Sequence, residues 1–332
     1  MTLTDAKILI TGPAGQLAEP LTRSLAKDND VWGIARFGDL EARARVDGYG
    51  VTTRSVDLAV GDFGDLPDDF TYVLHLAADQ SMGLDYDTAL RVNAEGTGLL
   101  LRHCREAKAA LVMSTFSVYR PNPDPSHAYT ETDPLGDANA PHAPTYSVSK
   151  LAQEAVARAC ARAFDLPITI ARMNASYGDN GGLPAIHLAL ARAGQPVVTR
   201  SDPCTYSPIH EDDICTQAGP LLAAASVPAT IVNWAGDEPV SVQTGAHGSP
   251  SYSGRRSSRS ATSRAPSPAS SPTTPSASRS PDRAPFRGAK EWLEWSRPAR
   301  RQRVTAPKVR CDPRGALSGS ARAASHQVGR GR

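Results

Sequence analysis

The segment Lys7–Thr11 (KILIT) runs directly into Gly12-Pro13-Ala14-Gly15-Gln16-Leu17-Ala18, so a short apolar run ends in a glycine-rich turn. Gln16–Ala26 has the pattern of a helix, and Asp30–Ala35 (DVWGIA) is typical of a second strand. A strand, a glycine turn, a helix and another strand, in this order, begin a parallel α/β sheet.

The glycine turn also predicts a phosphate-binding site. Gly12 permits the tight passage from strand to helix. Gly15 lets backbone N–H groups approach a pyrophosphate at the helix N-terminus, where the helix dipole favours an anion. Ala18 is small enough for close packing between helix and strand. We therefore expect a dinucleotide to bind at this turn.

Strands and helices continue to alternate up to residue 243. The apolar patterns predict strands at Val51–Leu58, Tyr72–Leu76, Ala110–Ser114, Pro167–Arg172 and Ile231–Trp234, and helices at Thr88–Ala107, Tyr146–Phe164 and Leu183–Ala193. This order predicts an α/β fold built on a doubly wound parallel sheet of the Rossmann type.

Composition divides the chain near Thr244. Residues 245–332 hold 18 Lys and Arg but 4 Asp and Glu, which leaves 18 basic and 30 acidic residues in 1–244. The basic part is rich in Ser, Arg, Pro and Ala and too poor in aliphatic residues to build a core. We expect residues 244–332 to be a disordered tail, and residues 1–243 to form one nucleotide-binding domain. That domain would embed the segments of a small substrate lobe at about 175–210.

Tyr146 and Lys150 lie four residues apart at the start of an Ala-rich helical run, so their side chains project from one helix face. A phenol with a pKa near ~10 is a poor acid–base group at neutral pH. A neighbouring ammonium lowers that pKa, which suits the tyrosine to moving a proton to or from a carbinol. The alternative interpretation is a solvated surface pair.

Several further segments accompany this pair in a recognisable order. They are Thr11–Ala18 (TGPAGQLA), His75–Ala78 (HLAA), Asn93–Thr97 (NAEGT), Met113–Tyr119 (MSTFSVY), Tyr146–Lys150 (YSVSK), Arg172–Gly178 (RMNASYG), Pro208–Ile214 (PIHEDDI) and Val232–Pro239 (VNWAGDEP). On these motifs, about residues 5–243 resemble the extended short-chain dehydrogenase/reductases, the family of NAD-dependent epimerases and dehydratases.

The resemblance implies a role for each matching position. Tyr146 would be the general acid–base, Lys150 would bind the nicotinamide ribose, and Thr115 would bond the substrate oxygen, with Ser114 as the neighbouring candidate. Asn174, Tyr177 and His210 would line the substrate side, although loop residues of these types often satisfy backbone groups instead. Cofactor contacts are expected from Gly12, Ala14, Gly15, Gln16, Leu17, Arg36, Asp57, Leu58, Ala77, Ala78, Asn93 and Lys150.

The end of the second predicted strand bears on the choice between NAD and NADP. An acidic residue there commonly holds a ribose 2′-hydroxyl, whereas an arginine attracts a 2′-phosphate. The place reads Ala35-Arg36-Phe37, which favours NADP unless Arg36 is only a surface residue. Asp57, at the end of the third predicted strand, would accept from the adenine amino group or serve as an ordinary turn residue.

The substrate is left open between a sugar nucleotide and a small carbonyl compound. Sugar-nucleotide enzymes of this family usually carry a longer lobe with basic groups, whereas Asp179–Thr205 is short and has Arg192 and Arg200 as its cations. His187 and Arg192 are expected to form the polar face of the helix at Leu183–Ala193. The alternative function is an NAD(P)-binding protein that is catalytically silent or acts as a sensor.

The pattern of the family breaks off abruptly after Gln243. Our hypothesis is a shift of reading frame near Thr244, because GC-rich codons read out of frame yield Arg, Pro, Ser and Ala. The rival is a genuine basic tail that binds nucleic acid through phosphate contacts, with a short helix at Ala289–Trp295. We regard nucleic-acid binding as the less favoured of the two.

The remaining expectations concern the setting of the protein. The five cysteines show neither metal-ligand spacing nor a disulfide framework, so no metal is expected. The sequence has no apolar run long enough to span a membrane and no signal peptide, which favours the cytoplasm. The resemblance also suggests a homodimer through the helices around Thr88–Ala107 and Tyr146–Phe164.

Overall fold

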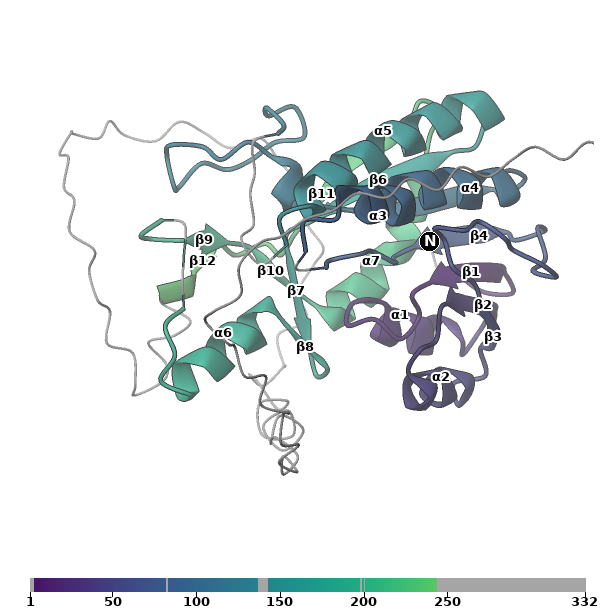
Figure 1. Cartoon of the computed structure of the whole chain (residues 1–332), viewed down its shortest axis with the longest axis horizontal. Coiled ribbons are helices and arrows are strands. Elements are labelled where there is room, and N and C mark those ends of the chain that lie inside the picture. Colours follow the sequence, from purple (N-terminus) through teal and green to yellow (C-terminus); the bar gives the residue numbers. More distant parts are fainter. Residues whose placement is uncertain (1–2, 82, 137–142, 198, 200, 244–332) are drawn as a thin grey trace, which may run out of the picture. The chain divides into compact units, whose positions relative to one another are not determined.

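A computed structural model of the chain describes residues 3–81, 83–136, 143–197, 199 and 201–243. At its centre is a parallel sheet of seven strands in the order β11-β6-β5-β4-β1-β2-β3 (Figure 1). The strands are β1 (Lys7–Thr11), β2 (Asp30–Ala35), β3 (Thr52–Ser55), β4 (Tyr72–His75), β5 (Ala109–Thr115), β6 (Ile168–Met173) and β11 (Thr230–Trp234). The predicted doubly wound, Rossmann-type sheet is confirmed.

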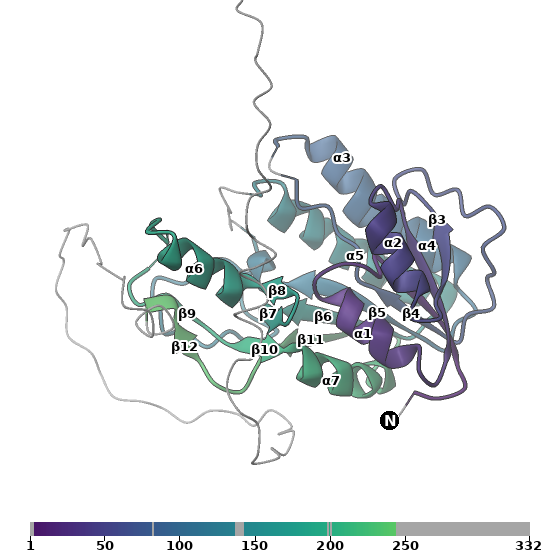
Figure 2. The ribbon, with the colours of Figure 1, turned by 90° about the horizontal axis from the view of Figure 1, so that it is seen from below.

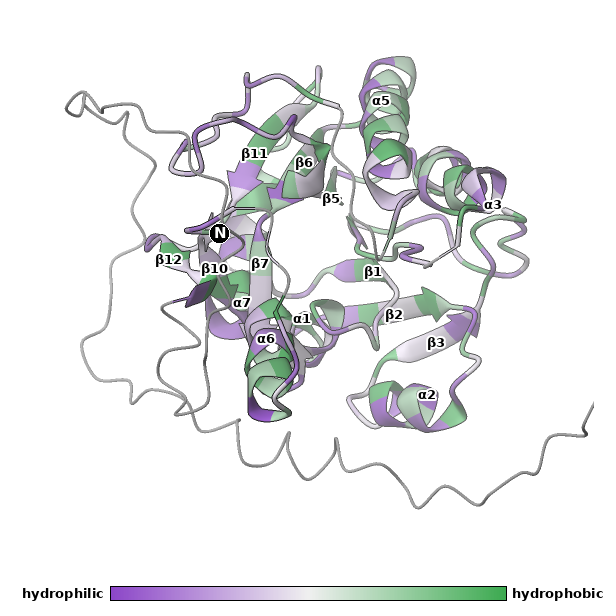
Figure 3. Cartoon of the chain, turned by 60° about the vertical axis from the view of Figure 1, so that its left-hand side comes forward, coloured by the Kyte–Doolittle hydropathy of each residue, from purple (hydrophilic) through white to green (hydrophobic). Residues whose placement is uncertain are grey.

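Helices cover both faces of this sheet (Figures 1 and 2). One face carries α1 (Ala18–Leu25), α2 (Leu40–Asp47) and α7 (Glu211–Ala223). The other carries α3 (Tyr86–Leu90), the π-helical turn η1 (Arg91–Glu95), α4 (Gly96–His103) and α5 (Tyr146–Phe164). Figure 3 shows hydrophilic and hydrophobic residues in alternation along α5, as expected of a helix with one face on a core.

The strands bury side chains on both faces. Ile8 and Ile10 of β1 pack with α1 and α7 in one hydrophobic cluster, while Leu9 packs with α4 and α5 in the other. Alternate residues of a strand point to opposite faces, so a strand between two helical layers is apolar throughout. This explains why KILIT is a continuous apolar run.

Smaller elements extend beyond the end of the sheet. They are β7 (Ala175–Gly178), β8 (Gly181–Gly182) and β10 (Pro208–His210) in one three-stranded sheet, β9 (Thr205–Tyr206) paired with β12 (Val240–Ser241), helix α6 (Leu183–Arg192) and the 3₁₀ turn η2 (Phe116–Val118). Strands β7 and β8 are antiparallel and form a hairpin, and β10 runs parallel to β7.

Two predicted elements differ from those observed. The helix predicted at Thr88–Ala107 begins at Tyr86 and is divided by η1, a π turn that interrupts the regular i→i−4 bonding at Asn93. The strand predicted at Val51–Leu58 ends at Ser55, because Asp57 forms a turn in which its side chain accepts from Ala59 N and its carbonyl from Gly61 N.

Other predictions lie close to the structure or outside it. β1, β2 and α5 have the predicted bounds, and the other predicted elements differ by a few residues at their ends. The predictions for residues 244–332, including the helix at Ala289–Trp295, fall outside the described residues. Among the residues that are described, no helix is long and apolar enough to cross a membrane.

Candidate active site

Two loops meet at the carboxyl edge of the sheet, between β1 and β4. Strand order reverses here, because β2 and β3 lie beyond β1 while β5 and β6 lie beyond β4. Gly12 follows β1 with φ +65°, and a Cβ atom on it would lie 3.2 Å from the Cα of Ala77, which follows β4. Ligands of doubly wound sheets bind in the crevice at such a reversal.

The glycine turn is tightly folded. Gly15 N donates to Gly12 O at 2.9 Å, and Glu19 N of α1 donates back to Gly15 O at 2.8 Å. A Cβ atom on Gly15 would lie 3.1 Å from Gly12 O, which is closer than most real contacts of this kind. Ala14 and Leu17 pack against the core beside α1. The backbone of the turn thus passes directly into the N-terminus of α1, as the phosphate-binding prediction requires.

A buried histidine ties the ends of β1 and β4 together. Thr11 Oγ1 lies 2.8 Å from His75 Nδ1, and His75 Nε2 lies 2.7 Å from Thr97 Oγ1. The Thr97 hydroxyl donates to Asn93 O, so His75 Nε2 is the donor to Thr97 and His75 Nδ1 accepts from Thr11. This pattern requires the neutral imidazole, and burial lowers the pKa of His75 to about 3.

Thr11 also positions the backbone where the cofactor is expected. Its Oγ1 accepts from the N–H groups of Leu76 and Ala77, at 3.0 and 2.9 Å. The predicted segments TGPAGQLA and HLAA are therefore joined by a threonine and a histidine whose roles the sequence analysis missed. The signal was the polar residue at the end of each apolar strand.

Asn93 connects this network to helix α5. Its side chain accepts from Asp79 N at 2.7 Å and donates to Asp79 O and to Ser149 Oγ at 3.0 and 2.9 Å. Ser149 in turn donates to the carbonyl of Tyr146 at 2.9 Å. The side chain of Asn93 thus bridges the loop after β4 and α5, and its expected contact with a cofactor stays a prediction.

Tyr146, Thr115 and Lys150 come together at the start of α5. Hydrogen bonds with the side chains of Gln80 and Thr115 lower the pKa of Tyr146, but desolvation by burial is the larger effect and leaves the pKa raised. Lys150 is not among the groups that shift this pKa, so the expectation that it lowers the pKa of Tyr146 stays a prediction. The Lys150 Nζ atom lies 6.0 Å from the centre of the Tyr146 ring. Gln80 was not predicted and follows the HLAA segment by two residues.

Lys150 is almost completely buried. Its Nζ donates to Met113 O of β5 at 2.6 Å. Burial lowers the pKa of Lys150 to about 7, against the opposing attraction of the Glu154 carboxylate. A buried lysine whose pKa lies near neutral pH does not fit the alternative of a solvated surface pair of Tyr146 and Lys150.

The structure separates the roles of Ser114 and Thr115. Ser114 is buried and its hydroxyl donates to Glu154 Oε1 at 2.5 Å, whereas Thr115 bonds with Tyr146. Glu154 also forms a buried ion pair with Arg172 of β6, through contacts of 2.9 and 2.7 Å. The hydroxyl of Ser114 therefore holds α5 to the sheet.

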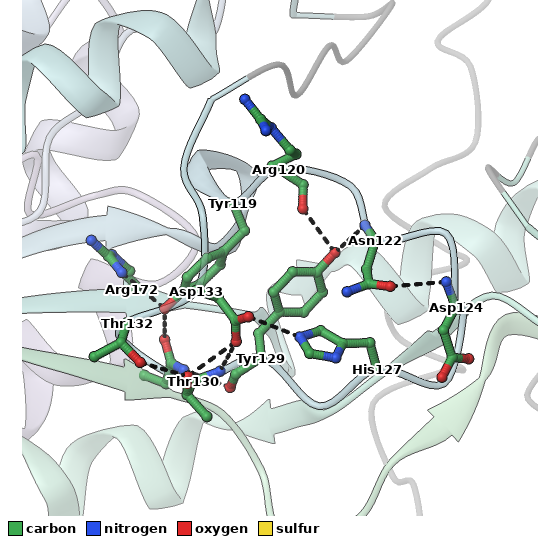
Figure 4. Close-up of polar contacts among 11 residues, drawn as sticks. Tyr119, Arg120, Asn122, Asp124, His127, Tyr129, Thr130, Thr132, Asp133 and Arg172 are labelled. Carbon is green, nitrogen blue, oxygen red and sulfur yellow. Dashed lines mark hydrogen bonds and ion pairs between the residues drawn. The ribbon is translucent and has the colours of Figure 1, made fainter. Parts of the chain in front are cut away.

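The segment after β5 is fastened to the same arginine (Figure 4). Arg172 donates to Tyr119 OH at 2.9 Å and to Glu131 O at 3.1 Å. Tyr129 lies beside Tyr119, with ring centres 5.0 Å apart, and His127 bonds Asp133. These contacts hold residues 119–133 in a defined path beside β6.

The remaining expected cofactor residues lie near the ends of β2, β3 and β4. Arg36 is exposed just beyond β2, while the nearest acid, Asp39, caps α2 by accepting from Glu41 N and Ala42 N. Asp57 is half-buried beside the buried Leu58. Ala78 follows Ala77 in the loop after β4. Their contacts with a cofactor stay predictions.

The three expected substrate-side residues already have partners in the protein. Asn174 Oδ1 accepts from Ser207 N at 3.3 Å, and His210 caps α7 by accepting from Asp212 N at 3.2 Å. The rings of Tyr177 and His210 lie edge to face with centres 5.0 Å apart. Their contact with a substrate also stays a prediction. Within the described part of the chain, no group of three metal-ligating side chains is placed to hold an ion.

Structural comparison finds the same fold in several sugar-nucleotide enzymes. One is the UDP-glucuronic acid 4-epimerase of Bacillus cereus, whose structure holds UDP-glucuronic acid and NAD. It is 25% identical, with a TM-score of 0.59 over 71% of this chain and 80% of that one. A UDP-N-acetylglucosamine 4-epimerase from Methanobrevibacter ruminantium is 18% identical, with a TM-score of 0.62 over 74% and 81%.

A dTDP-glucose 4,6-dehydratase from Streptomyces venezuelae, with NAD and TYD bound, is 21% identical with a TM-score of 0.60 over 73% of this chain and 79% of that one. A search of curated proteins found no match. The model of the NAD dependent epimerase/dehydratase family matches residues 8–201, more than half of the sequence. The chain therefore belongs to the NAD dependent epimerase/dehydratase family.

Proposed function

We propose that this protein is an NAD(P)-dependent enzyme that acts at a hydroxyl or carbonyl carbon of its substrate. The observation that supports the proposal best is the proximity of Thr115, Tyr146 and Lys150 to one another, beside the crevice between β1 and β4. A buried lysine with a pKa near 7 and a tyrosine bonded to a threonine are suited to proton transfer rather than to a solvated surface.

The residues at the crevice fit a dinucleotide. The turn at Gly12 and Gly15 offers backbone N–H groups at the N-terminus of α1, and its close packing leaves little room for side chains at the two glycines. Ala77 lines the opposite wall. A nicotinamide cofactor bound there would supply the hydride donor or acceptor.

Each catalytic residue has a distinct task in this proposal. Tyr146 exchanges a proton with the substrate oxygen through its hydroxyl. Thr115 donates a hydrogen bond to the same oxygen as negative charge develops on it. Lys150 holds the ribose of the cofactor and, when protonated, favours the phenolate of Tyr146. Glu154 supports that charge because its carboxylate attracts the Lys150 ammonium.

We further propose that NADP is preferred over NAD. Arg36 is exposed at the end of β2, and the Asp39 carboxylate is engaged in capping α2. A 2′-phosphate would therefore lie near the Arg36 cation, whereas the Asp39 carboxylate is turned toward the N-terminus of α2. The similar epimerase and dehydratase structures described above contain NAD, so the preference rests on this chain's own residues.

For the substrate, we propose a sugar nucleotide. The similar enzymes act on UDP- and dTDP-linked sugars, and this chain covers about four-fifths of their length. A small carbonyl compound is the second candidate, because the short segment Asp179–Thr205 has Arg192 and Arg200 as its cations, few for binding a diphosphate.

Cofactor titration followed by a substrate panel tests the proposal. Fluorescence titration with NADPH and NADH should show saturable binding of one equivalent, tighter for NADPH. A panel of UDP-sugars, dTDP-sugars and simple ketones, analysed by chromatography, should then yield a product from a nucleotide sugar. Cofactor binding without turnover of any compound would favour the catalytically silent alternative, and no cofactor binding would contradict the proposal.

A further inference from the structure

Gln16, in the glycine turn, is bonded to the β7–β8 hairpin 160 residues further along the chain. Ser176 Oγ donates to Gln16 Oε1 at 2.8 Å, and Asn180 Nδ2 donates to Gln16 O at 2.9 Å. A longer contact of 3.4 Å joins Gln16 Nε2 to Asn180 Oδ1. The side chain and the backbone of one turn residue are thus both held by the hairpin.

A second anchor fixes the hairpin from the other side. Glu211, the first residue of α7, accepts from Asp179 N through Oε2 at 3.1 Å. Gly178 packs so closely on Glu211 that a Cβ atom would overlap its carboxylate. Arg23 of α1 lies 3.8 Å from the other carboxylate oxygen. The hairpin is therefore tied to α7 by Glu211, and its bonds to the glycine turn run through Gln16.

The strand that Gln16 holds also carries a residue of the expected substrate side. Ser176 and Tyr177 are successive residues of β7, so their side chains project to opposite faces. Ser176 faces the glycine turn, and Tyr177 packs on His210 of the neighbouring strand β10. A shift of Ser176 would move Tyr177 with it, because the two share a backbone.

We propose that Gln16, Ser176 and Asn180 form a clasp that couples dinucleotide binding at the glycine turn to the position of the β7–β8 hairpin. The proposal rests on the proposed function in taking the turn as the cofactor site. Gln16 directly follows Gly15, so phosphate oxygens that bond the N–H groups of the turn also fix the residue that holds the hairpin. Gln16 is in this view a positioning residue.

The coupling works in both directions. A cofactor that orders the turn lowers the mobility of the hairpin. In return, a hairpin held in place keeps the turn in the conformation that binds the cofactor, which raises the affinity for it. The contacts are neutral hydrogen bonds, so the expected change in cofactor affinity on breaking the clasp is modest, about three- to tenfold.

Hydrogen exchange of the full chain measures the clasp directly. In the unchanged protein, saturating NADPH should slow amide exchange in peptides that cover residues 175–182. Gln16→Ala should raise the exchange of these peptides without cofactor and reduce the slowing by NADPH, although its backbone carbonyl can still accept from Asn180. Asn122→Ala, which alters a similar exposed turn bond to Asp124 N, should leave the response unchanged.

Ser176→Ala tests the same bond from outside the cofactor turn. It should weaken NADPH binding about three- to tenfold, and the double variant with Gln16→Ala should be no weaker than Gln16→Ala alone, because both remove one interaction. Additive effects, or a slowing of hairpin exchange by NADPH that is as large in Gln16→Ala as in the unchanged protein, would overturn the clasp. Failure of the unchanged protein to bind NADPH or NADH would instead contradict the proposed function, and faster hairpin exchange in ligand-free Gln16→Ala would still report the contact.

Discussion

Neighbouring residues on one strand can have separate tasks, and Ser114 and Thr115 illustrate this. Their side chains lie on opposite faces of β5, so the hydroxyl of Ser114 reaches Glu154 while that of Thr115 reaches Tyr146. The family resemblance alone left a choice between the two positions. The structure favours Thr115 for the substrate oxygen, because Ser114 already donates its proton to a buried carboxylate.

This difference predicts opposite effects for two matched variants. Thr115→Val should lower kcat about a hundredfold, since it removes one donor to the developing charge. Ser114→Ala should change kcat little but lower the free energy of unfolding by about 1.5–3 kcal/mol, the loss of one hydrogen bond to a charged group. Steady-state rates and urea unfolding of both variants check the assignment. A larger loss of kcat for Ser114→Ala would reverse it.

The Arg36 side chain is expected to determine the choice between NADP and NAD. Arg36→Ala should weaken NADPH binding about tenfold and leave NADH binding nearly unchanged, because only the first carries a 2′-phosphate. Titration of both cofactors measures the ratio. Arg43, which bonds Thr53 and stacks on Phe37 in the same region, provides a control arginine. Equal losses for the two cofactors after Arg36→Ala would contradict the NADP preference.

At the scale of elements, the buried pair of Glu154 and Arg172 joins helix α5 to strand β6. Both side chains are at least 96% buried, and Arg172 also holds the segment after β5 through Tyr119. Removing one partner of a buried pair leaves an uncompensated charge, which is strongly destabilising. The position of helix α5 therefore depends on this contact.

Glu154→Gln should lower the free energy of unfolding by about 3–5 kcal/mol. The exposed pair Asp87 and Arg91 is the control, since Asp87→Asn should change stability by less than about 0.5 kcal/mol. Urea unfolding followed by circular dichroism measures both. Equal, small effects for the two variants would show that the buried pair does not hold α5 in place.

Predictability from sequence also differs between elements. β1, β2 and α5 were predicted with their observed bounds, because a strand buried on both faces and a long amphipathic helix leave clear apolar patterns. The pattern at Thr88–Ala107 gave no sign of the π turn η1. The bonds of Asn93 to Asp79 and Ser149 that accompany this turn are tertiary contacts, which a local sequence pattern does not record. The same limit applies to Gln80 and to the contacts of Gln16, which join segments far apart in the sequence.

At the scale of the whole molecule, the buried histidine predicts how stability changes with pH. The pKa of His75 falls from 6.5 to about 3 in the folded protein, because burial disfavours the charged imidazole. Between about pH 3 and pH 6.5, His75 is protonated in the unfolded chain but neutral in the folded protein. Stability is therefore present above pH 6.5 and is lost as pH falls below it.

Lowering the pH from 7.5 to 5.5 should cost about 1.4 kcal/mol through His75 alone. Urea unfolding at the two pH values measures the total change, and His75→Asn identifies the contribution of the histidine. The variant should be less stable at pH 7.5 but should lose less stability on acidification. An equal loss in both proteins would show that His75 does not set the acid sensitivity.

The central claim is that Tyr146 transfers a proton in an NAD(P)-dependent reaction at the crevice between β1 and β4. Its most direct test is the turnover of the best substrate from the panel by the unchanged protein and by Tyr146→Phe, with cofactor affinity measured in parallel. We predict that Tyr146→Phe binds the cofactor within about threefold of the unchanged protein and that its kcat is lower by at least about a hundredfold. Full turnover by Tyr146→Phe would contradict the claim.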